Sequence, residues 1–323
     1  MSIKTGLRIL FALLAVAIVA IGVAACGGDN DNETTNAGGG LIQKNPDNSG
    51  VQITVGSKNF TEEYILGEIY AQGLEAAGYD VKTDLNLGSE VVALRALEAD
   101  EIDGYPEYTA TALTSFFGEK PEDVPSDAQQ AYEQSKAEFA KEGLVAFPPA
   151  PFADSNAVGT LTSTAEKLGL QNVSDLEGKS QDLTLYGSPE CRQRVDCLLG
   201  LEDGYGLHFK SFTPVDIGLR YEVLDKGQAD LSILFTSDAQ LATSDKYTIL
   251  TDDKGIFPAA NPLFIARKQT VDEAGPDFGT VIEEVQQDLS LKVMQELNAR
   301  VDIDKQEPAD VAHDYLKSAG LVE

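Results

Sequence analysis

Apolar and polar residues alternate where the folded part of the chain is expected to begin, and helical spacing follows. Residues 51–56 alternate and stop at a glycine, which is typical of a strand, and apolar residues at helical spacing then run over 64–78. The succession repeats with an expected strand at 79–87, a helix capped by Ser89 and a new strand from Ile102. Strands that alternate with helices of this length predict a parallel sheet in an α/β fold.

The rest of the pattern divides the chain into two lobes. Further strands are expected at residues 144–147, 157–161, 183–187, 231–235 and 259–266, and further helices at 127–142, 217–224 and from 270 onward. The proline-rich strand that leads into 157–161, and the strand 259–266, are expected to cross between the lobes and to form a hinge. The predicted boundaries are residues 51–153 with 261–323 for lobe I, and residues 154–260 for lobe II.

The nine residues Asp103–Thr111 include two tyrosines, two carboxylates and two threonine hydroxyl groups. The proline after Tyr105 disfavours helix there, so a strand should end, and Thr109 or Thr111 should cap the next helix. Tyr108 would then lie on the loop or first helical turn, in the crevice where open α/β sheets bind ligands. The alternative is that both tyrosines are half-buried aromatics that stabilise a turn.

The loop after the first strand offers a second candidate. Asn59 and Glu62 are spaced as a helix cap and its N3 partner, so a helix is expected to begin here. A helix N-terminus that follows a strand favours anions, and Lys58 would strengthen that preference. The alternative for Lys58 is an ordinary solvated lysine.

The N-terminus predicts export. Lys4 and Arg8 precede an apolar run over residues 9–23, and the small residues before Cys26 resemble a bacterial lipobox. The apolar run falls short of the roughly 18 to 20 residues that span a bilayer. We therefore expect residues 1–25 to be a signal peptide, and the mature protein to be extracytoplasmic and anchored to the bacterial membrane by lipid on Cys26.

Composition and net charge limit which binding partners the protein can have. Residues 26–50 are polar and glycine-rich, which predicts a flexible tether between the membrane and the folded domain. The formal net charge is −29, and without the two basic residues of the signal it is 22 basic against 53 acidic residues, or −31. This charge excludes nucleic acid as a partner, and its simplest interpretation is solubility or a saline habitat.

Cys191 and Cys197 form one even pair once Cys26 is lipidated. In an exported chain such a pair favours a disulfide, and the six-residue separation requires a turn or broken helix between the two thiols. The bridge would hold Arg192 and Arg194 on a pinned loop. The two histidines are distant in sequence and make no zinc spacing with these thiols, so neither a metal nor a cofactor is expected.

Four motifs resemble those of the substrate-binding proteins of glycine betaine/choline/carnitine ABC importers. They are residues 56–62, 103–111, 236–238 and 252–258, and the likeness extends over 51–323. The resemblance implies a type II periplasmic-binding-protein fold of two parallel-sheet lobes joined by two crossing strands. It also implies a monomer that binds an osmoprotectant in the interlobe cleft and delivers it to a permease driven by an ATPase.

The resemblance further implies a cage of aromatic rings around a quaternary ammonium group. The residues that match ligand-binding positions of the family are Lys58, Tyr108, Thr111, Asp154 and Arg194. Among them Tyr108 matches a cage tyrosine, Asp154 an acidic residue lining the cage, and Arg194 the arginine that binds the ligand's carboxylate. Arg192 lies close enough in sequence to be the alternative.

The chain also departs from the family pattern. Asn156, Phe235 and Ala260 stand where the family usually has tyrosine, and only Phe235 keeps an aromatic face. The cage is either completed by another aromatic residue, namely Tyr105, Tyr205, Phe152 or Phe257, or the ligand is a different amino acid derivative or polar metabolite. Lys58 and Arg194 would favour a carboxylate-bearing betaine over choline.

Two other classes of function can be weighed on the same residues. Paired carboxylates such as Asp103 with Glu107 could in principle perform acid–base chemistry. However, the sequence has no nucleophile elbow, no phosphate loop and no metal spacing, so we do not expect an enzyme. A sensor that uses the same fold without transport remains an alternative.

Overall fold

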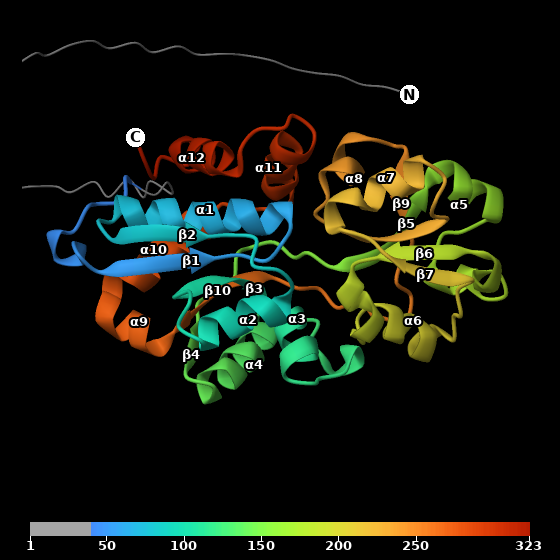
Figure 1. Ribbon diagram of the computed structural model, residues 1–323, viewed down its shortest axis with the longest axis horizontal. Coiled ribbons are helices and arrows are strands. Elements are labelled where there is room, and N and C mark those ends of the chain that lie inside the picture. Colours follow the sequence, from blue (N-terminus) through green and yellow to red (C-terminus); the bar gives the residue numbers. More distant parts are fainter. Residues whose placement is uncertain (1–39) are drawn as a thin grey trace, which may run out of the picture. The chain divides into compact units, whose positions relative to one another are not determined.

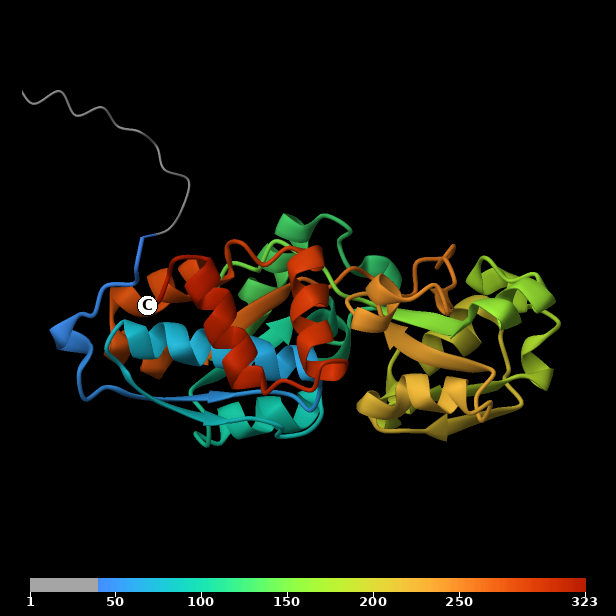
Figure 2. The same cartoon turned by 90° about the horizontal axis from the view of Figure 1, so that it is seen from above.

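The computed structural model describes residues 40–323, which form two five-stranded mixed sheets with helices around them (Figures 1 and 2). The predicted signal peptide and Cys26 lie outside the described residues. The first sheet has the order β2-β1-β3-β10-β4 and comprises β1 (Gln52–Gly56), β2 (Asp80–Asp84), β3 (Gly104–Tyr108), β4 (Leu144–Ala146) and β10 (Pro262–Arg267). The second has the order β7-β6-β8-β5-β9 and comprises β5 (Asn156–Leu161), β6 (Thr184–Gly187), β7 (Ser211–Pro214), β8 (Leu231–Phe235) and β9 (Tyr247–Ile249).

Helices cover both faces of the first sheet (Figure 1). One buried cluster joins β1 to α1 (Thr61–Ala76), α10 (Pro276–Gln286), α11 (Leu291–Asp302) and α12 (Pro308–Ser318). A second cluster joins β3 and β10 to α2 (Glu90–Glu98) and α4 (Ala128–Lys141) on the other face. The remaining helices are α3 (Thr109–Thr111), α5 (Thr162–Leu168), α6 (Leu198–Tyr205), α7 (Arg220–Asp225), α8 (Ala239–Thr243) and α9 (Lys268–Ala274).

The two lobes agree with the predicted fold, but their sheets are mixed rather than parallel. β1 runs parallel to β2 and β3, whereas β10 is antiparallel to both β3 and β4. In the second sheet β5 is antiparallel to its neighbours β8 and β9. The reason is the connection between lobes: β10 enters the first sheet from the side where β3 ends, with Pro262 opposite Tyr108, and must therefore run backwards.

Two connecting segments join the sheets, one after β4 and one before β10. They lie side by side, because Asp154 and Ala260 form an antiparallel bridge. The side-chain amide of Asn261 donates to the Phe152 carbonyl at 2.6 Å and so ties the segments together again. Paired connections of this kind are the usual position of a hinge between lobes.

The prediction that a strand ends near Tyr105 is wrong, because β3 continues through Pro106 to Tyr108. Pro106 fits because β1 pairs with β3 only at Gly104, which leaves that edge of β3 without a ladder farther along. The Tyr108 N–H, on the same edge, donates to its neighbour Glu107. Tyr108 itself is the N-cap residue of α3, so neither predicted threonine caps the helix.

Two other local predictions need correction. Phe60, not Asn59, is the N-cap of α1, and its side chain has no atom that could accept a cap bond; the predicted partner Glu62 instead accepts from the Tyr108 hydroxyl. The predicted tether does not reach residue 50: Asn48 is buried and its amide donates to the Ala77 carbonyl at 2.9 Å, while Asn45 donates to Asp277. Over residues 40–323 no helix combines the length and apolarity needed to cross a membrane.

Candidate functional site

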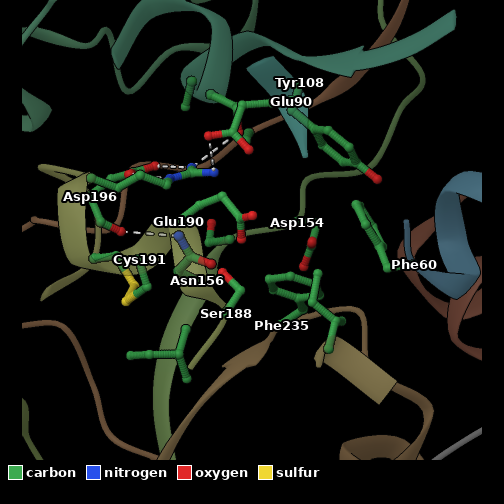
Figure 3. A pocket seen from close by; sticks show the side chains of 18 of the residues that line it. Phe60, Glu90, Tyr108, Asp154, Asn156, Ser188, Glu190, Cys191, Asp196 and Phe235 are labelled. Carbon is green, nitrogen blue, oxygen red and sulfur yellow. Dashed lines mark hydrogen bonds and ion pairs between the residues drawn. A yellow bond between two sulfur atoms is a disulfide. The ribbon is translucent and has the colours of Figure 1, made fainter. Parts of the chain in front are cut away.

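One cavity collects the predicted ligand-binding residues (Figure 3). Its walls come from the loop after β1, the end of β3, the two connecting segments, the end of β8 and the disulfide segment before α6. All of the predicted residues line it, namely Lys58, Tyr108, Thr111, Asp154, Asn156, Arg194 and Phe235. Because these residues come from both lobes, only the folded chain brings them together.

Three aromatic rings lie along one side of the cavity. The Phe60 ring lies 6.2 Å from the Tyr108 ring and 5.3 Å from the Phe235 ring, measured between centroids. Figure 3 shows these rings around the Asp154 carboxylate. Phe60 was missed in the sequence reasoning, although it belongs to the first motif and lies two residues after Lys58.

Other aromatic residues were expected to complete the cage, and one of them lines the cavity. That residue is Phe257. Tyr105, on β3, is fully buried against α2, and Phe152 belongs to the core of the first lobe. Tyr205 is directed into the turn at Asp252, to which its hydroxyl donates at 2.5 Å. Asn156 and Ala260 line the cavity without supplying a ring.

Lys58 is buried and forms ion pairs with two carboxylates. Its ammonium lies 2.5 Å from Glu107 Oε1, 3.5 Å from Glu63 Oε1 and 4.4 Å from the centroid of the Tyr108 ring. Burial alone would lower the pKa of Lys58, but the Glu107 and Glu63 carboxylates outweigh it and raise the pKa. The lysine is therefore charged, neutralised by its own lobe, and placed over one face of the Tyr108 ring.

Arg194 spans the cavity between the lobes. It donates to both oxygens of Asp196, at 2.7 and 2.5 Å, and reaches Glu90 of α2 at 3.5 Å and the Thr111 hydroxyl at 3.4 Å. Burial opposes its charge, but the Asp196 carboxylate raises the pKa of the guanidinium. Arg192 instead donates to the Phe212 carbonyl and does not line the cavity. Geometry therefore favours Arg194 over Arg192 as the arginine that faces a ligand.

Asp154 is a buried anionic group of the cavity and forms no ion pair among the described residues, which also holds for the less buried Glu190. Its Oδ1 accepts hydrogen bonds from the Thr236 hydroxyl and the Ser237 N–H, each at 3.0 Å. Burial, together with the nearby Asp238 carboxylate, raises the pKa of Asp154 to about 6. At neutral pH the group is therefore mostly ionised beside the aromatic rings, where it would attract a cation.

Arg220 is a second residue that the sequence reasoning missed. Its guanidinium carbon lies 3.9 Å from the centroid of the Phe235 ring, and it pairs with Asp238 at 2.8 Å. One face of Phe235 is thus covered by an internal cation. No sequence signal identified Arg220, because its pairing with Asp238 depends on how α7 packs beside the end of β8.

The disulfide between Cys191 and Cys197 closes the segment that carries Arg194 and Asp196. Its Cα atoms are 5.2 Å apart, and the short 3₁₀ helix Pro189–Gln193 ends before α6 begins, which provides the required break. The Asn156 amide also donates to the Asp196 carbonyl at 3.0 Å. The segment is therefore held from two sides.

The geometry defines a class, the two-lobed binding protein with a ligand cavity between its lobes. The family described as the substrate binding domain of ABC-type glycine betaine transport system matches residues 51–318, and the chain belongs to this family. A glycine-betaine-binding protein of Pseudomonas aeruginosa is 35% identical over 282 residues, which are 84% of this chain and 89% of that protein.

Two further relatives extend the comparison. An ergothioneine transport permease/ergothioneine binding protein of Helicobacter pylori is 29% identical over 271 residues, covering 83% of this chain and 48% of that longer protein. A crystal structure of a glycine betaine/carnitine/choline ABC transporter has a TM-score of 0.65 and 27% identity, covering 82% of this chain and 98% of the other.

Proposed function

We propose that this protein captures a betaine-like quaternary ammonium solute in the interlobe cavity and delivers it to the permease and ATPase of an ABC importer. The observation that carries the proposal is the group of three rings, Phe60, Tyr108 and Phe235, around the unpaired carboxylate of Asp154. Aromatic faces attract a desolvated quaternary ammonium by about 2 kcal/mol per good contact. An ionised carboxylate beside them adds attraction that is not screened by bulk water.

The carboxylate of a betaine has a partner on the opposite wall. Arg194 and the Thr111 hydroxyl, which approach each other to 3.4 Å across the two lobes, supply donors there. Since Arg194 already contacts Asp196 and Glu90, an incoming carboxylate would have to share its donors with these two residues. Binding would then draw the lobes together, which supports lobe closure as the signal to the permease.

Calorimetric titration of the purified protein with glycine betaine, choline, carnitine and proline betaine tests the proposal. A dissociation constant in the micromolar range or tighter for at least one betaine is expected. Absence of heat with all four would overturn it. Histidine and glutamate serve as controls, because they carry charge without a quaternary ammonium group.

A second candidate is a different amino acid derivative, such as ergothioneine. Asn156 and Ala260 leave two wall positions without a ring, which makes room for a bulkier or more polar solute. The relative from Helicobacter pylori named for ergothioneine supports the same idea. Ergothioneine belongs in the same titration, and tighter binding of it than of the other four solutes would select this candidate.

The location of the protein is part of the proposal. The apolar segment before Cys26 supports export followed by lipid attachment to that cysteine, which would keep the binding domain at the outer face of the cell membrane. We expect the binding domain to act as a monomer.

A further inference from the structure

A chain of hydrogen bonds behind the cavity wall connects the two lobes. The Tyr108 hydroxyl donates to Glu62 Oε1 at 2.6 Å, and Glu62 Oε2 accepts from Asn298 Nδ2 at 3.2 Å. The same amide nitrogen donates to the Ser237 carbonyl at 3.1 Å, and the Ser237 N–H donates to Asp154 at 3.0 Å. The chain therefore begins at a ring of the first lobe and ends at the carboxylate of the second.

The middle members of this chain lie outside the cavity. Neither Glu62 nor Asn298 lines this cavity, although both line a neighbouring hollow that shares Phe60 and Phe235 with it, and they are 2% and 4% exposed. Glu62 belongs to α1 and Asn298 to α11, which both pack on the first lobe. Ser237 follows β8 of the second lobe. The amide of Asn298 is thus the point at which the chain passes from one lobe to the other.

Each link depends on its neighbours because all of these groups are buried. A buried carboxylate needs donors, and the two side chains that donate to Glu62 at the distances above are Tyr108 and Asn298. The Asn298 Oδ1 atom is buried and has no partner among the described residues, so the amide is held by its nitrogen alone. Removing the Asn298 amide would free Glu62, and through it the Tyr108 hydroxyl, to reorient.

We propose that Glu62 and Asn298 are positioning residues that couple the orientation of the Tyr108 ring to the placement of Ser237 and Asp154 in the other lobe. Solute affinity then depends on two residues that never touch the solute. The inference rests on the proposed function, since it takes Tyr108 and Asp154 as the groups that hold the ammonium.

A double-mutant cycle on solute affinity tests the coupling. Tyr108→Phe keeps the ring and removes the hydroxyl, and Asn298→Ala removes the bridging amide. Each is expected to weaken binding, and the double variant should bind within about threefold of the weaker single variant, because coupled residues are not additive. Fully multiplied losses would overturn the proposal. Glu62→Ala, which removes both oxygens that accept from Tyr108 and Asn298, should behave as Asn298→Ala does.

Gln295 provides the matched control. It lies one turn earlier on α11 and donates from Nε2 to the Thr236 carbonyl at 3.2 Å, so it also joins the lobes, but it forms no hydrogen bond with Glu62 or Tyr108. Gln295→Ala should combine with Tyr108→Phe multiplicatively. Equal coupling at Gln295 and Asn298 would mean that any contact between the lobes has this effect, and would overturn the specific chain.

Two further steps separate a folding defect, or a failure of the proposed function, from an absence of coupling. If Asn298→Ala does not fold, judged by circular dichroism and thermal unfolding, Asn298→Ser takes its place in the same cycle. The wild-type titration is read first: if no quaternary ammonium solute binds, the proposed function has failed, and the cycle is run with whichever other solute does bind. Additivity with that solute would refute the coupling independently.

Discussion

Tyr108 carries two separate tasks in one side chain. Its ring faces the cavity beside Phe60, while its hydroxyl is buried against Glu62. Tyr108→Ala removes both and should weaken binding of a quaternary ammonium solute by about 10- to 100-fold, since a desolvated cation–π contact is worth roughly 2 kcal/mol. Calorimetry measures the change. Tyr247→Ala on β9, which does not line the cavity, is the control, and unchanged affinity in Tyr108→Ala would remove Tyr108 from the site.

Arg194 should discriminate between zwitterionic and cationic solutes. Arg194→Ala removes the donor for a betaine carboxylate and leaves Asp196 and Glu90 without their cation. Betaine affinity should fall at least about tenfold, as loss of a charge-assisted pair costs more than about 1.4 kcal/mol, whereas choline affinity should change little or rise. Arg192→Ala, whose side chain lies outside the cavity, should affect neither. Equal losses for both solutes would show that Arg194 acts structurally.

Asp154 should make solute binding depend on pH. Because its pKa is raised to about 6 and a bound ammonium favours the ionised carboxylate, affinity should be near its maximum at pH 7 and above and should fall as the pH decreases through 6. By linkage the decrease approaches about tenfold per pH unit.

Titrations between pH 5 and 7 measure this dependence. Asp154→Asn should bind more weakly at pH 7 and show a nearly flat profile over the same range. Glu62 accepts from the Tyr108 hydroxyl behind the cavity wall, and burial raises its pKa to about 8, so it contributes only above this window. A sloping profile in Asp154→Asn would assign the titration to another group.

Among the elements, the disulfide segment is both cavity wall and crosslink. Replacing Cys191 and Cys197 together by serine opens a short loop, and chain-entropy reasoning gives a loss of about 2 kcal/mol in the free energy of unfolding. Solute affinity should fall as well, because Arg194 and Asp196 lie on the released segment. Urea unfolding and calorimetry measure the two effects. Lost stability with unchanged affinity would show that the Asn156 contact alone holds the segment.

Strand β3 is longer than its local sequence predicts. A proline inside Asp103–Thr111 predicts a break, yet the strand continues because β10 pairs along one edge and β1 leaves the other edge open. This matters for the site, because Tyr108 is the last residue of β3 and lies at the cavity, where α3 begins.

At the scale of the whole molecule, anchoring and binding should be separable. The cavity is built from residues 58–260, so the lipid proposed on Cys26 is not needed for it. Cys26→Ser should move the protein from the membrane fraction to the soluble fraction while the dissociation constant for the solute stays within about twofold, which is the ordinary scatter of surface substitutions. Fractionation followed by calorimetry tests both parts. A variant that remains in the membrane fraction would refute the lipid anchor.

The sequence by itself determined the elements and most of the site. Alternation at 51–56 and helical spacing after it predict β1 and α1, and the motifs named the residues that line the cavity. Local spacing suffices for these features because strand and helix periods are written in consecutive residues. The family resemblance supplied the roles that spacing could not.

Only the tertiary structure decided strand direction, charge pairing and the remaining wall. The antiparallel β10 follows from the path between lobes, and the pairing of Lys58 with Glu107 and of Arg220 with Asp238 depends on residues that are far apart in sequence. Phe60 joins the ring group because the fold brings the loop after β1 close to the ends of β3 and β8. Burial removes water from such charges and fixes which partners neutralise them, and burial is a property of the packed molecule rather than of any one stretch of chain.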